Sequence, residues 1–424
     1  MISRPAPSRV PTDPRLAAAA RRTLTGLLHR SAPEPLAVEE PGRTAVVGPR
    51  DDGTAPLRVT VHDPRAWTAV AWTGSAGLGE GYFRGWWDTD DLVGLIRTLI
   101  RATGGLDALR NRWAAASAPV AEPLRRLRRP SRRRDRGNIH AHYDLSNDFF
   151  AMLLDPTMAY SCAVFAAPDE PLEAAQRRKI DGWYRDLGIG PGTRVVEIGS
   201  GWGGFALHAA QEYGAEVTTT TVSDAQHEWV AKRVADAGLE HRVRLLDRDY
   251  RDLEGRYDRL CSIEMIEAVD WRDHDRYFRT VERLLTPAGL AGIQAIVVAD
   301  RRYERAKRST DFIKRWVFPG GCLPSITAIA DSVTRATDLR MVGLRDIGPH
   351  YAQTLARWRH NLLAHADDLP GLGLDTQFRR LFEFYLAYCE AAFRERHVSV
   401  VQLVLAGPEW RGPVTPTPPV GAAA

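Results

Sequence analysis

The segment that decides the fold is residues 195–205, which read VVEIGSGWGGF. Its first half has the apolar character of a buried strand that ends beside an acid, Glu197, and its glycines predict a tight turn into a helix that begins near Gly203. Glycines at such a turn let backbone N–H groups and the positive end of the helix approach a ligand with no Cβ atom in the way. The segment therefore predicts a strand–turn–helix unit with a ligand at the carboxyl end of the strand.

The glycine spacing is compatible with two classes of ligand. Gly199, Gly201 and Gly204 also satisfy the dinucleotide pattern G-x-G-x-x-G, which calls for an acid at the end of the next strand. That strand, predicted over residues 216–222, ends in threonine and serine instead, and an acid beside the turn disfavours a pyrophosphate. A nucleoside with a positive charge, S-adenosylmethionine, is favoured; a dinucleotide and a ligand-free structural turn are the alternatives.

Strands and helices alternate from residue 137 onward. Strands are predicted over residues 194–198, 216–222, 243–246, 259–263 and 291–298, and helices from Gly203, from Asp224 and over residues 273–285. This alternation predicts an α/β fold: a doubly wound, mostly parallel sheet, with a smaller N-terminal domain. Ligands of such sheets bind at the carboxyl ends of the strands, where Asp249, Tyr250 and Glu267 also fall.

The chain of 424 residues is long enough for two domains. A flexible segment is predicted over residues 1–50, which are rich in proline, arginine and alanine. A small domain is predicted over residues 51–120, with a strand over 57–61 and a helix over 88–100. We predict the α/β domain over residues 138–410 and a flexible tail over 411–424.

Residues 121–137 are predicted to form an arginine-rich linker, with eight arginines between Arg125 and Arg136. Such a run is typical of a solvated tether, and it is also compatible with contact to anionic lipid headgroups. Nucleic acid is disfavoured as a partner.

Composition and spacing exclude several classes of protein. No apolar run approaches the ~20 residues that a membrane-spanning helix needs, and the N-terminus lacks the apolar core of a secretory signal. The four cysteines have no zinc-type spacing, and His140 and His142 lie two residues apart, so no metal site is predicted. These features favour the cytoplasm.

Three further segments carry side chains typical of a catalytic site. They are residues 140–150 (HAHYDLSNDFF) with 160–163 (YSCA), residues 264–269 (EMIEAV), and residues 318–325 (FPGGCLPS) with Tyr351 downstream. Together with the glycine turn, they resemble the cyclopropane-fatty-acyl-phospholipid synthase family, which includes the mycolic acid cyclopropane synthases. The resemblance runs from about residue 137 to residue 405.

Two features place the chain more finely within that resemblance. Residues 77–87 (GLGEGYFRGWW) are similar to the extra N-terminal domain of the longer, phospholipid-acting members. Residues 264–269, Gln294 and the overall length resemble the actinobacterial branch that methylates oleoyl chains towards 10-methyl, tuberculostearic-type fatty acids.

The resemblance implies a binding site for S-adenosylmethionine and a second site for a bicarbonate ion that serves as the base. The cofactor would be held by Tyr160, Ser161, Glu197, Gly199, Gly201, Gly203, Thr221, Gln226, Asp249 and Tyr250. The bicarbonate would be held by Cys162, Glu267, Tyr351 and the backbone of Ile296. Gln294 stands where the family has a histidine, and an amide donates a hydrogen bond but does not titrate. Glu264, three residues before Glu267, is the alternative acid.

The resemblance also implies the reaction and its partners. Methyl transfer to the cis double bond of a phospholipid acyl chain leaves a carbocation, which aromatic faces stabilise. Loss of a proton then gives a 10-methylene chain, the favoured product, or a cyclopropane ring. The first product implies a flavin- or nicotinamide-dependent reductase as partner. We also expect contact with the inner face of the membrane and a homodimer.

Two other functions stay open: a small-molecule or protein methyltransferase, and a non-catalytic lipid-binding protein. Neither needs the anion-site residues together with an intact glycine turn. The aromatic helix over residues 378–393 is expected to be core or the wall of an acyl tunnel.

Overall fold

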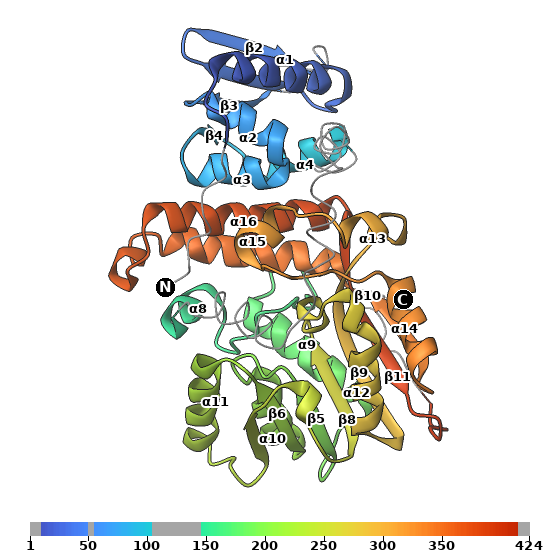
Figure 1. Ribbon diagram of the computed structural model, residues 1–424. Coiled ribbons are helices and arrows are strands. Elements are labelled where there is room, and N and C mark those ends of the chain that lie inside the picture. The colour runs from blue at the N-terminus through green and yellow to red at the C-terminus, as the bar shows by residue number, and fades with distance from the viewer. Residues whose placement is uncertain (1–9, 50–54, 104–145, 414–424) are drawn as a thin grey trace.

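The computed structural model describes residues 10–49, 55–103 and 146–413 (Figure 1). These residues form a small N-terminal unit and a larger α/β unit, with a layer of two long helices between them. The predicted linker over 121–137, both histidines of the 140–142 pair and the tail from residue 414 lie outside the described residues.

The larger unit is built on a seven-stranded sheet with the order β10-β11-β9-β8-β5-β6-β7. Its strands are β5 (Arg194–Ile198), β6 (Glu216–Thr221), β7 (Val243–Asp247), β8 (Tyr257–Ile263), β9 (Leu285–Val298), β10 (Arg340–Asp346) and β11 (Val398–Ala406). The first five pair in parallel, and β11 runs antiparallel to both β9 and β10. The chain leaves β5 towards β6 on one side and returns to β8 on the other, so the strand order reverses at β5. The α/β prediction is confirmed.

Helices cover both faces of this sheet and create two apolar cores. They are α9 (Leu172–Leu187), α10 (Gly204–Tyr213), α11 (Asp224–Asp236), α12 (His274–Leu284) and α14 (Ile326–Ala336). Neighbouring residues of β5 point to opposite faces: Val195 packs with α9 and α10, and Val196 packs with α12 and α14. A strand that is buried on both sides explains why the segment before the glycine turn is continuously apolar.

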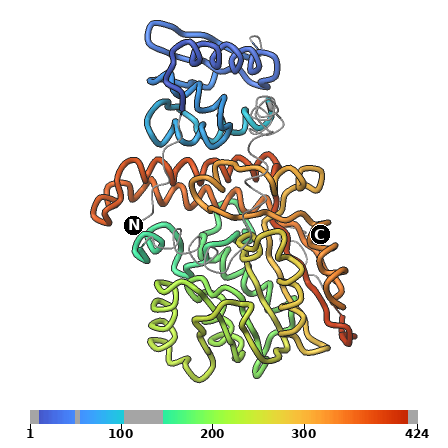
Figure 2. The backbone as a smooth tube through the Cα atoms, viewed as in Figure 1, coloured from blue at the N-terminus to red at the C-terminus, as the bar shows by residue number. Residues whose placement is uncertain are grey.

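The two long helices α15 (Gly348–Ala364) and α16 (Thr376–Arg394) lie side by side above the carboxyl ends of the strands (Figure 2). The predicted aromatic helix is α16, and its rings are buried, as for Phe382 and Phe384, or partly buried, as for Phe378. Within the described residues these side chains serve the core. The shorter segments of this unit are α8 (Asn147–Leu153), α13 (Asp300–Ala306) and a π-helix over Ile313–Val317.

The N-terminal unit begins much earlier than the sequence suggested. It contains α1 (Pro14–Ser31), β1 (Leu36–Glu40), β2 (Arg43–Val47), β3 (Leu57–Val61), α2 (Arg65–Thr73), α3 (Ser75–Phe83), β4 (Trp87–Thr89) and α4 (Leu92–Thr103). The prediction of a flexible segment over residues 1–50 is wrong for residues 10–49. Asp13 caps α1, Pro14 starts it, and Leu24 and Leu28 are buried on one face; the surrounding arginines and alanines had hidden this amphipathic pattern.

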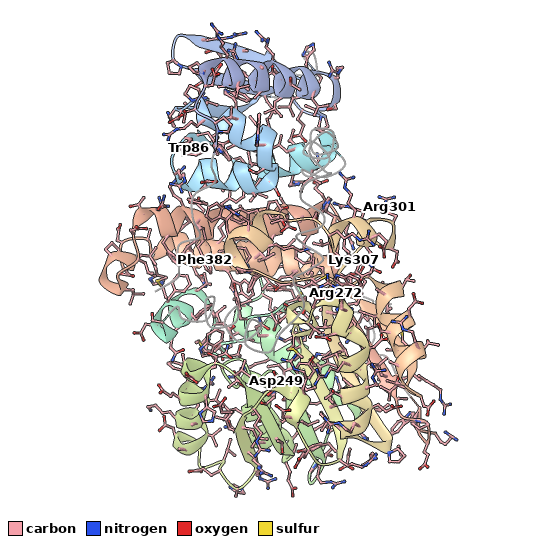
Figure 3. The ribbon with its side chains drawn as sticks, in the orientation of Figure 1. Trp86, Asp249, Arg272, Arg301, Lys307 and Phe382 are labelled. Atoms are coloured by element: carbon pink, nitrogen blue, oxygen red, sulfur yellow. The ribbon has the colours of Figure 1, made fainter. Side chains whose placement is uncertain are left out.

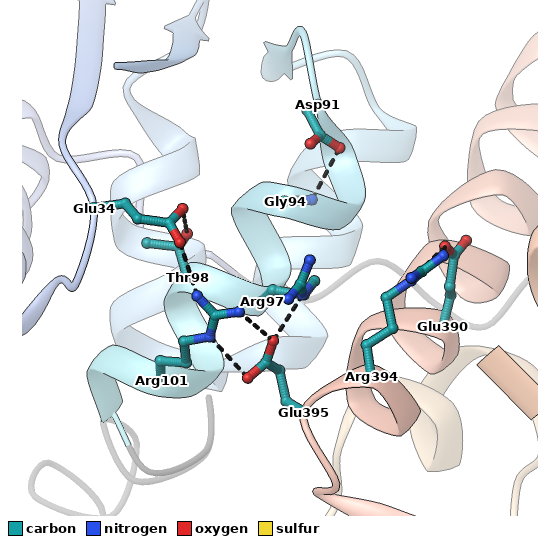
Figure 4. Close-up of polar contacts among 9 residues, drawn as sticks. All are labelled: Glu34, Asp91, Gly94, Arg97, Thr98, Arg101, Glu390, Arg394 and Glu395. Carbon is teal, nitrogen blue, oxygen red and sulfur yellow. Dashed lines mark hydrogen bonds and ion pairs between the residues drawn. The ribbon is translucent and has the colours of Figure 1, made fainter. Parts of the chain in front are cut away.

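Gly79 of α3 lets the N-terminal unit pack closely on the α/β unit. A Cβ atom on Gly79 would lie 2.2 Å from a ring carbon of Phe312, so a larger residue there would separate α3 from the π-helix. The same junction carries ion pairs, because Arg97 and Arg101 of α4 both bind Glu395 at the end of α16 (Figure 4).

Candidate functional site

A cavity of about 630 Å³ opens at the carboxyl ends of β5, β6 and β8. Nine of the ten predicted cofactor residues line it: Tyr160, Ser161, Glu197, Gly199, Gly201, Thr221, Gln226, Asp249 and Tyr250. Gly203 is the exception, because it forms the helix start behind the turn. Figure 3 shows Asp249 at this edge of the sheet, below the helical layer that contains Phe382. The structure thus brings the predicted set together at the place where doubly wound sheets bind ligands.

The glycine turn has the backbone conformation that its residues predict. Gly199 and Gly203 have φ angles of 91° and 85°, which side chains rarely tolerate. The turn is fixed to the next strand, because the N–H of Ser200 donates to the carbonyl of Thr220 at 2.8 Å. Gly199, Gly201 and Gly204 therefore present bare backbone to the cavity, while Gly203 shapes the turn behind it.

Glu197 supplies a buried carboxylate at the base of this turn. The side chain is 3% exposed and accepts a hydrogen bond from the hydroxyl of Thr219 at 2.6 Å. Burial raises the pKa of Glu197 to about 8. A positively charged ligand in the cavity would compensate for the burial of the ionised form. The residues present therefore fit S-adenosylmethionine, whose sulfonium group carries such a charge.

Lys179, which the sequence analysis did not single out, also lines the cavity. The residue is 2% exposed, and its ammonium group donates to the hydroxyl of Ser161 at 2.7 Å. Burial lowers the pKa of Lys179, and the carboxylates of Glu264 and Asp155 oppose that effect. The signal was present in the sequence: Lys179 shares the apolar face of α9 with Trp183, one turn further on.

The centre of the predicted anion site is Glu264. Its Oε1 accepts hydrogen bonds from the backbone N–H of Cys162 at 2.9 Å and from the side-chain amide of Gln294 at 2.7 Å. Its Oε2 accepts from the hydroxyl of Tyr351 at 2.6 Å. Glu264 also lines the cofactor cavity, and burial raises its pKa while these three donors oppose the increase.

Glu267, the predicted catalytic acid, lies behind Glu264 and does not line the cavity. Its Oε1 accepts from the backbone N–H of Ile296, and its Oε2 is buried without a hydrogen-bond partner. Burial, together with the nearby charge of Glu264, raises the pKa of Glu267 to about 8. Two carboxyl groups this close do not both ionise easily, so Glu267 carries a proton at neutral pH.

The predicted bicarbonate ion does not fit this arrangement. Cys162, Gln294 and Tyr351 direct their donors to Glu264, and the N–H of Ile296 is directed to Glu267. An added anion would therefore compete with two carboxyl groups of the chain itself. The thiol of Cys162 faces away, towards backbone carbonyls, and burial raises its pKa.

A connected set of aromatic rings joins the cofactor cavity to the carboxylate of Glu264. Tyr160 contacts Trp202 and Trp358, with ring centroids 6.5 Å and 5.1 Å away. Trp358 contacts Tyr351 at 6.0 Å. These rings are buried or partly buried, and their faces are suited to stabilising a carbocation where water is excluded.

Two further features concern the described residues, 10–49, 55–103 and 146–413. None of the helices in these ranges is both long and apolar enough to cross a bilayer. In the same residues, no three histidine, cysteine, aspartate or glutamate side chains gather as a metal site would require.

Comparison with known proteins identifies the family of the chain. Residues 130–403 match the model of the mycolic acid cyclopropane synthetase family. The chain is 40% identical to the tuberculostearic acid methyltransferase UfaA1 of Mycobacterium tuberculosis, over 95% of this chain and 94% of that protein. It is 34% identical to the cyclopropane-fatty-acyl-phospholipid synthase of Escherichia coli, over 83% and 88% of the two chains.

A solved structure of a mycolic acid cyclopropane synthase also matches this chain. The mycolic acid cyclopropane synthase CmaA1, in complex with SAH and CTAB, superposes with a TM-score of 0.60 and 31% identity. The match covers 64% of this chain and 98% of that one. With a cofactor cavity built on the glycine turn and a family match over most of its length, the chain belongs to the mycolic acid cyclopropane synthetase family and is an S-adenosylmethionine-dependent methyltransferase.

Proposed function

We propose that this enzyme methylates the cis double bond of an unsaturated phospholipid acyl chain, such as an oleoyl chain, and forms a 10-methylene fatty acid. The observation that carries this proposal is the match to a tuberculostearic acid methyltransferase, which extends over both the N-terminal and the α/β units. A separate flavin- or nicotinamide-dependent reductase would then convert the methylene group to a methyl group.

The residues of the site have distinct roles in this reaction. S-adenosylmethionine supplies an electrophilic methyl group when it is bound. The glycine turn and Glu197 hold its charged end, and Thr221 and Gln226, which bond to each other at 2.9 Å, lie where the ribose of such cofactors binds. Tyr160, Trp202 and Trp358 exclude water and offer aromatic faces to the positive charge that develops on the acyl chain.

Cyclopropane formation is the second candidate. It is favoured by the identity with the E. coli synthase, which is lower and covers less of the chain. In both routes a proton leaves the new methyl group. The electrons of that C–H bond close a ring onto the neighbouring cation in one route, and in the other they form an exocyclic double bond after a hydride shift, so the same site architecture serves both.

The lipid substrate implies contact with a membrane surface. The predicted arginine-rich linker lies outside the described residues, but residues 301–308 (RRYERAKR) provide a second basic segment, with five basic residues and one acid. Arg301 and Arg308 are exposed on or beside α13. We propose that this segment lies against anionic headgroups while an acyl chain enters the enzyme.

Mass spectrometry of phospholipid fatty acids tests the function. Cells that contain oleate would express this chain alone, and a gain of one CH₂ in the C18 chains is expected. Proton NMR of the purified ester then separates an exocyclic methylene from a cyclopropane ring. The matched control is Gly199→Val, because a Cβ at φ 91° is strained and would lie 3.3 Å from Met265 in the cavity wall. No mass gain in the wild type would overturn the proposal.

A further inference from the structure

Glu264 occupies the place where an external anion would be expected. Both of its carboxylate oxygens are used: Oε1 accepts two hydrogen bonds and Oε2 accepts one, all between 2.6 and 2.9 Å. The three donors come from separate parts of the chain, namely the loop before α9, strand β9 and helix α15. A planar O–C–O group held by convergent donors is the arrangement that a bound bicarbonate would have.

The backbone of Glu264 is also specialised. It follows the end of β8 with a φ angle of 51°, in the left-handed region that non-glycine residues rarely adopt. Its N–H donates to the carbonyl of Gln294 at 2.8 Å, which continues the pairing of β8 with β9 by one residue. This conformation turns the carboxylate towards the cavity, and such strain is typical of functional positions.

We infer that Glu264 is the resident base of this enzyme, and that its carboxylate takes the role and the place of a bound bicarbonate ion. Glu264 is the acid that both lines the cofactor cavity and holds the donors of the anion site. Glu267 lies behind it with its Oε1 held by the backbone of Ile296, so it supports the site without facing the cavity.

The proton transfer that we assign to Glu264 rests on the proposed function, the methylation of an acyl chain. The π electrons of the alkene form the new carbon–carbon bond while the carbon–sulfur bond breaks and leaves its pair on sulfur. In the methylene route a hydride moves from the methylated carbon to the neighbouring cation, and a proton then leaves the new methyl group for a carboxylate oxygen of Glu264. The electrons of that C–H bond form the double bond. Burial makes Glu264 a stronger base than an exposed glutamate, which suits this role.

Two variants distinguish the loss of the proton acceptor from damage to the surrounding site. Glu264→Gln keeps the shape but cannot accept a proton, so we expect turnover to fall by roughly 100-fold. Affinity for S-adenosylhomocysteine, followed by intrinsic tryptophan fluorescence, should stay unchanged, because this ligand has no sulfonium charge that the carboxylate could favour. Glu264→Gly should fold, because glycine favours this φ angle, and it opens a space lined by the donors of Cys162, Gln294 and Tyr351. We expect added bicarbonate to restore turnover in the glycine variant and to have no effect on the glutamine variant.

A binding measurement tests the inference independently of the reaction. Protein freed of carbon dioxide under argon would be titrated with ¹³C-bicarbonate and followed by ¹³C NMR. Wild type should bind no bicarbonate and turn over equally with and without it, whereas Glu264→Gly should bind one equivalent. Stoichiometric bicarbonate binding by wild type, or Glu264→Gln turnover within a few fold of wild type, would overturn the inference. If wild type methylates no phospholipid, the proposed function fails, while the bicarbonate titration still decides the role of Glu264.

Discussion

Gln402 donates a hydrogen bond from its side-chain amide to the Oε1 of Gln294 at 2.9 Å, and the two residues are direct partners in the pairing of β11 with β9. Gln402 is oriented in turn, because its own Oε1 accepts from Arg345 at 3.0 Å. Arg345 is fixed by Asp186 at 2.8 Å. The relay leaves the NH₂ group of Gln294 facing Glu264, so the amide at this position works as a fixed donor.

The first prediction concerns this relay. Gln402→Met removes the donor at similar volume, which lets the Gln294 amide rotate and present its oxygen to Glu264. We expect kcat to fall about tenfold, the order of one charge-assisted hydrogen bond, while the KM for S-adenosylmethionine is unchanged. Steady-state kinetics with both substrates measure this split. An equal rise in KM would indicate general damage to the cavity and contradict a positioning role.

The second prediction concerns cofactor binding and pH. The pKa of Glu197 is raised to about 8 in the free protein, so the side chain is protonated at neutral pH. A sulfonium ligand favours the ionised form, and its binding therefore releases a proton below this pKa. Affinity for S-adenosylmethionine should rise with pH, by up to about tenfold per unit, and level off above about pH 8.

Isothermal titration in buffers of different ionisation enthalpy measures that proton release. S-adenosylhomocysteine is the control ligand, because its neutral sulfide should bind with little dependence on pH. Glu197→Gln is the control variant and should flatten the profile of the charged cofactor. Parallel pH profiles for the two ligands would show that another group, such as Glu267, is responsible.

The sequence predicted the positions of the five parallel strands to within a few residues at most ends, because apolar runs and glycine turns are local signals. The resemblance to a known family, and not these local signals alone, supplied the ten cofactor residues, nine of which line one cavity. The antiparallel strands β10 and β11 were not predicted, since their pairing joins segments that lie far apart along the chain.

The choice between Glu264 and Glu267 shows where sequence reasoning stopped. Residues three apart share a face only within a continuous helix. Here Glu264 is in the left-handed region and a 3₁₀ turn, Ile266–Ala268, begins after it, so the two carboxylates separate into a front and a rear position. Family resemblance pointed to the rear acid, and only the hydrogen bonds identify the front one.

The third prediction concerns the junction between the two units. Glu395 binds Arg101 at 2.7 Å and 2.8 Å and Arg97 at 2.7 Å, and these arginines hold its pKa below the usual value (Figure 4). Glu395→Gln should cost about 1 kcal/mol of unfolding free energy at pH 7. Because the folded pKa is lowered, this contribution is present above the unfolded pKa and disappears as pH falls through the folded one.

Urea unfolding of wild type and Glu395→Gln at pH 7 and in acid measures that difference. The matched control is Glu173→Gln, which breaks an exposed pair with Arg177 at 2.9 Å and should cost about 0.3 kcal/mol. A difference for Glu395→Gln that persists unchanged in acid would mean that packing, and not charge, holds the junction.

The fourth prediction concerns the basic segment over residues 301–308. Figure 3 shows Arg301 beside Lys307 at the side of the molecule that carries α13. If this side faces the bilayer, Arg301→Gln should weaken binding to vesicles that contain anionic lipid by about fivefold, which corresponds to roughly 1 kcal/mol for one basic residue.

Arg194→Gln is the control, because Arg194 is exposed at the start of β5, at the opposite edge of the sheet from the cavity. Sedimentation with vesicles of phosphatidylglycerol and phosphatidylcholine measures both, and the loss should shrink in high salt because exposed charges are screened. Equal losses for the two variants would mean that net charge alone attracts the enzyme, and that α13 has no special place at the lipid surface.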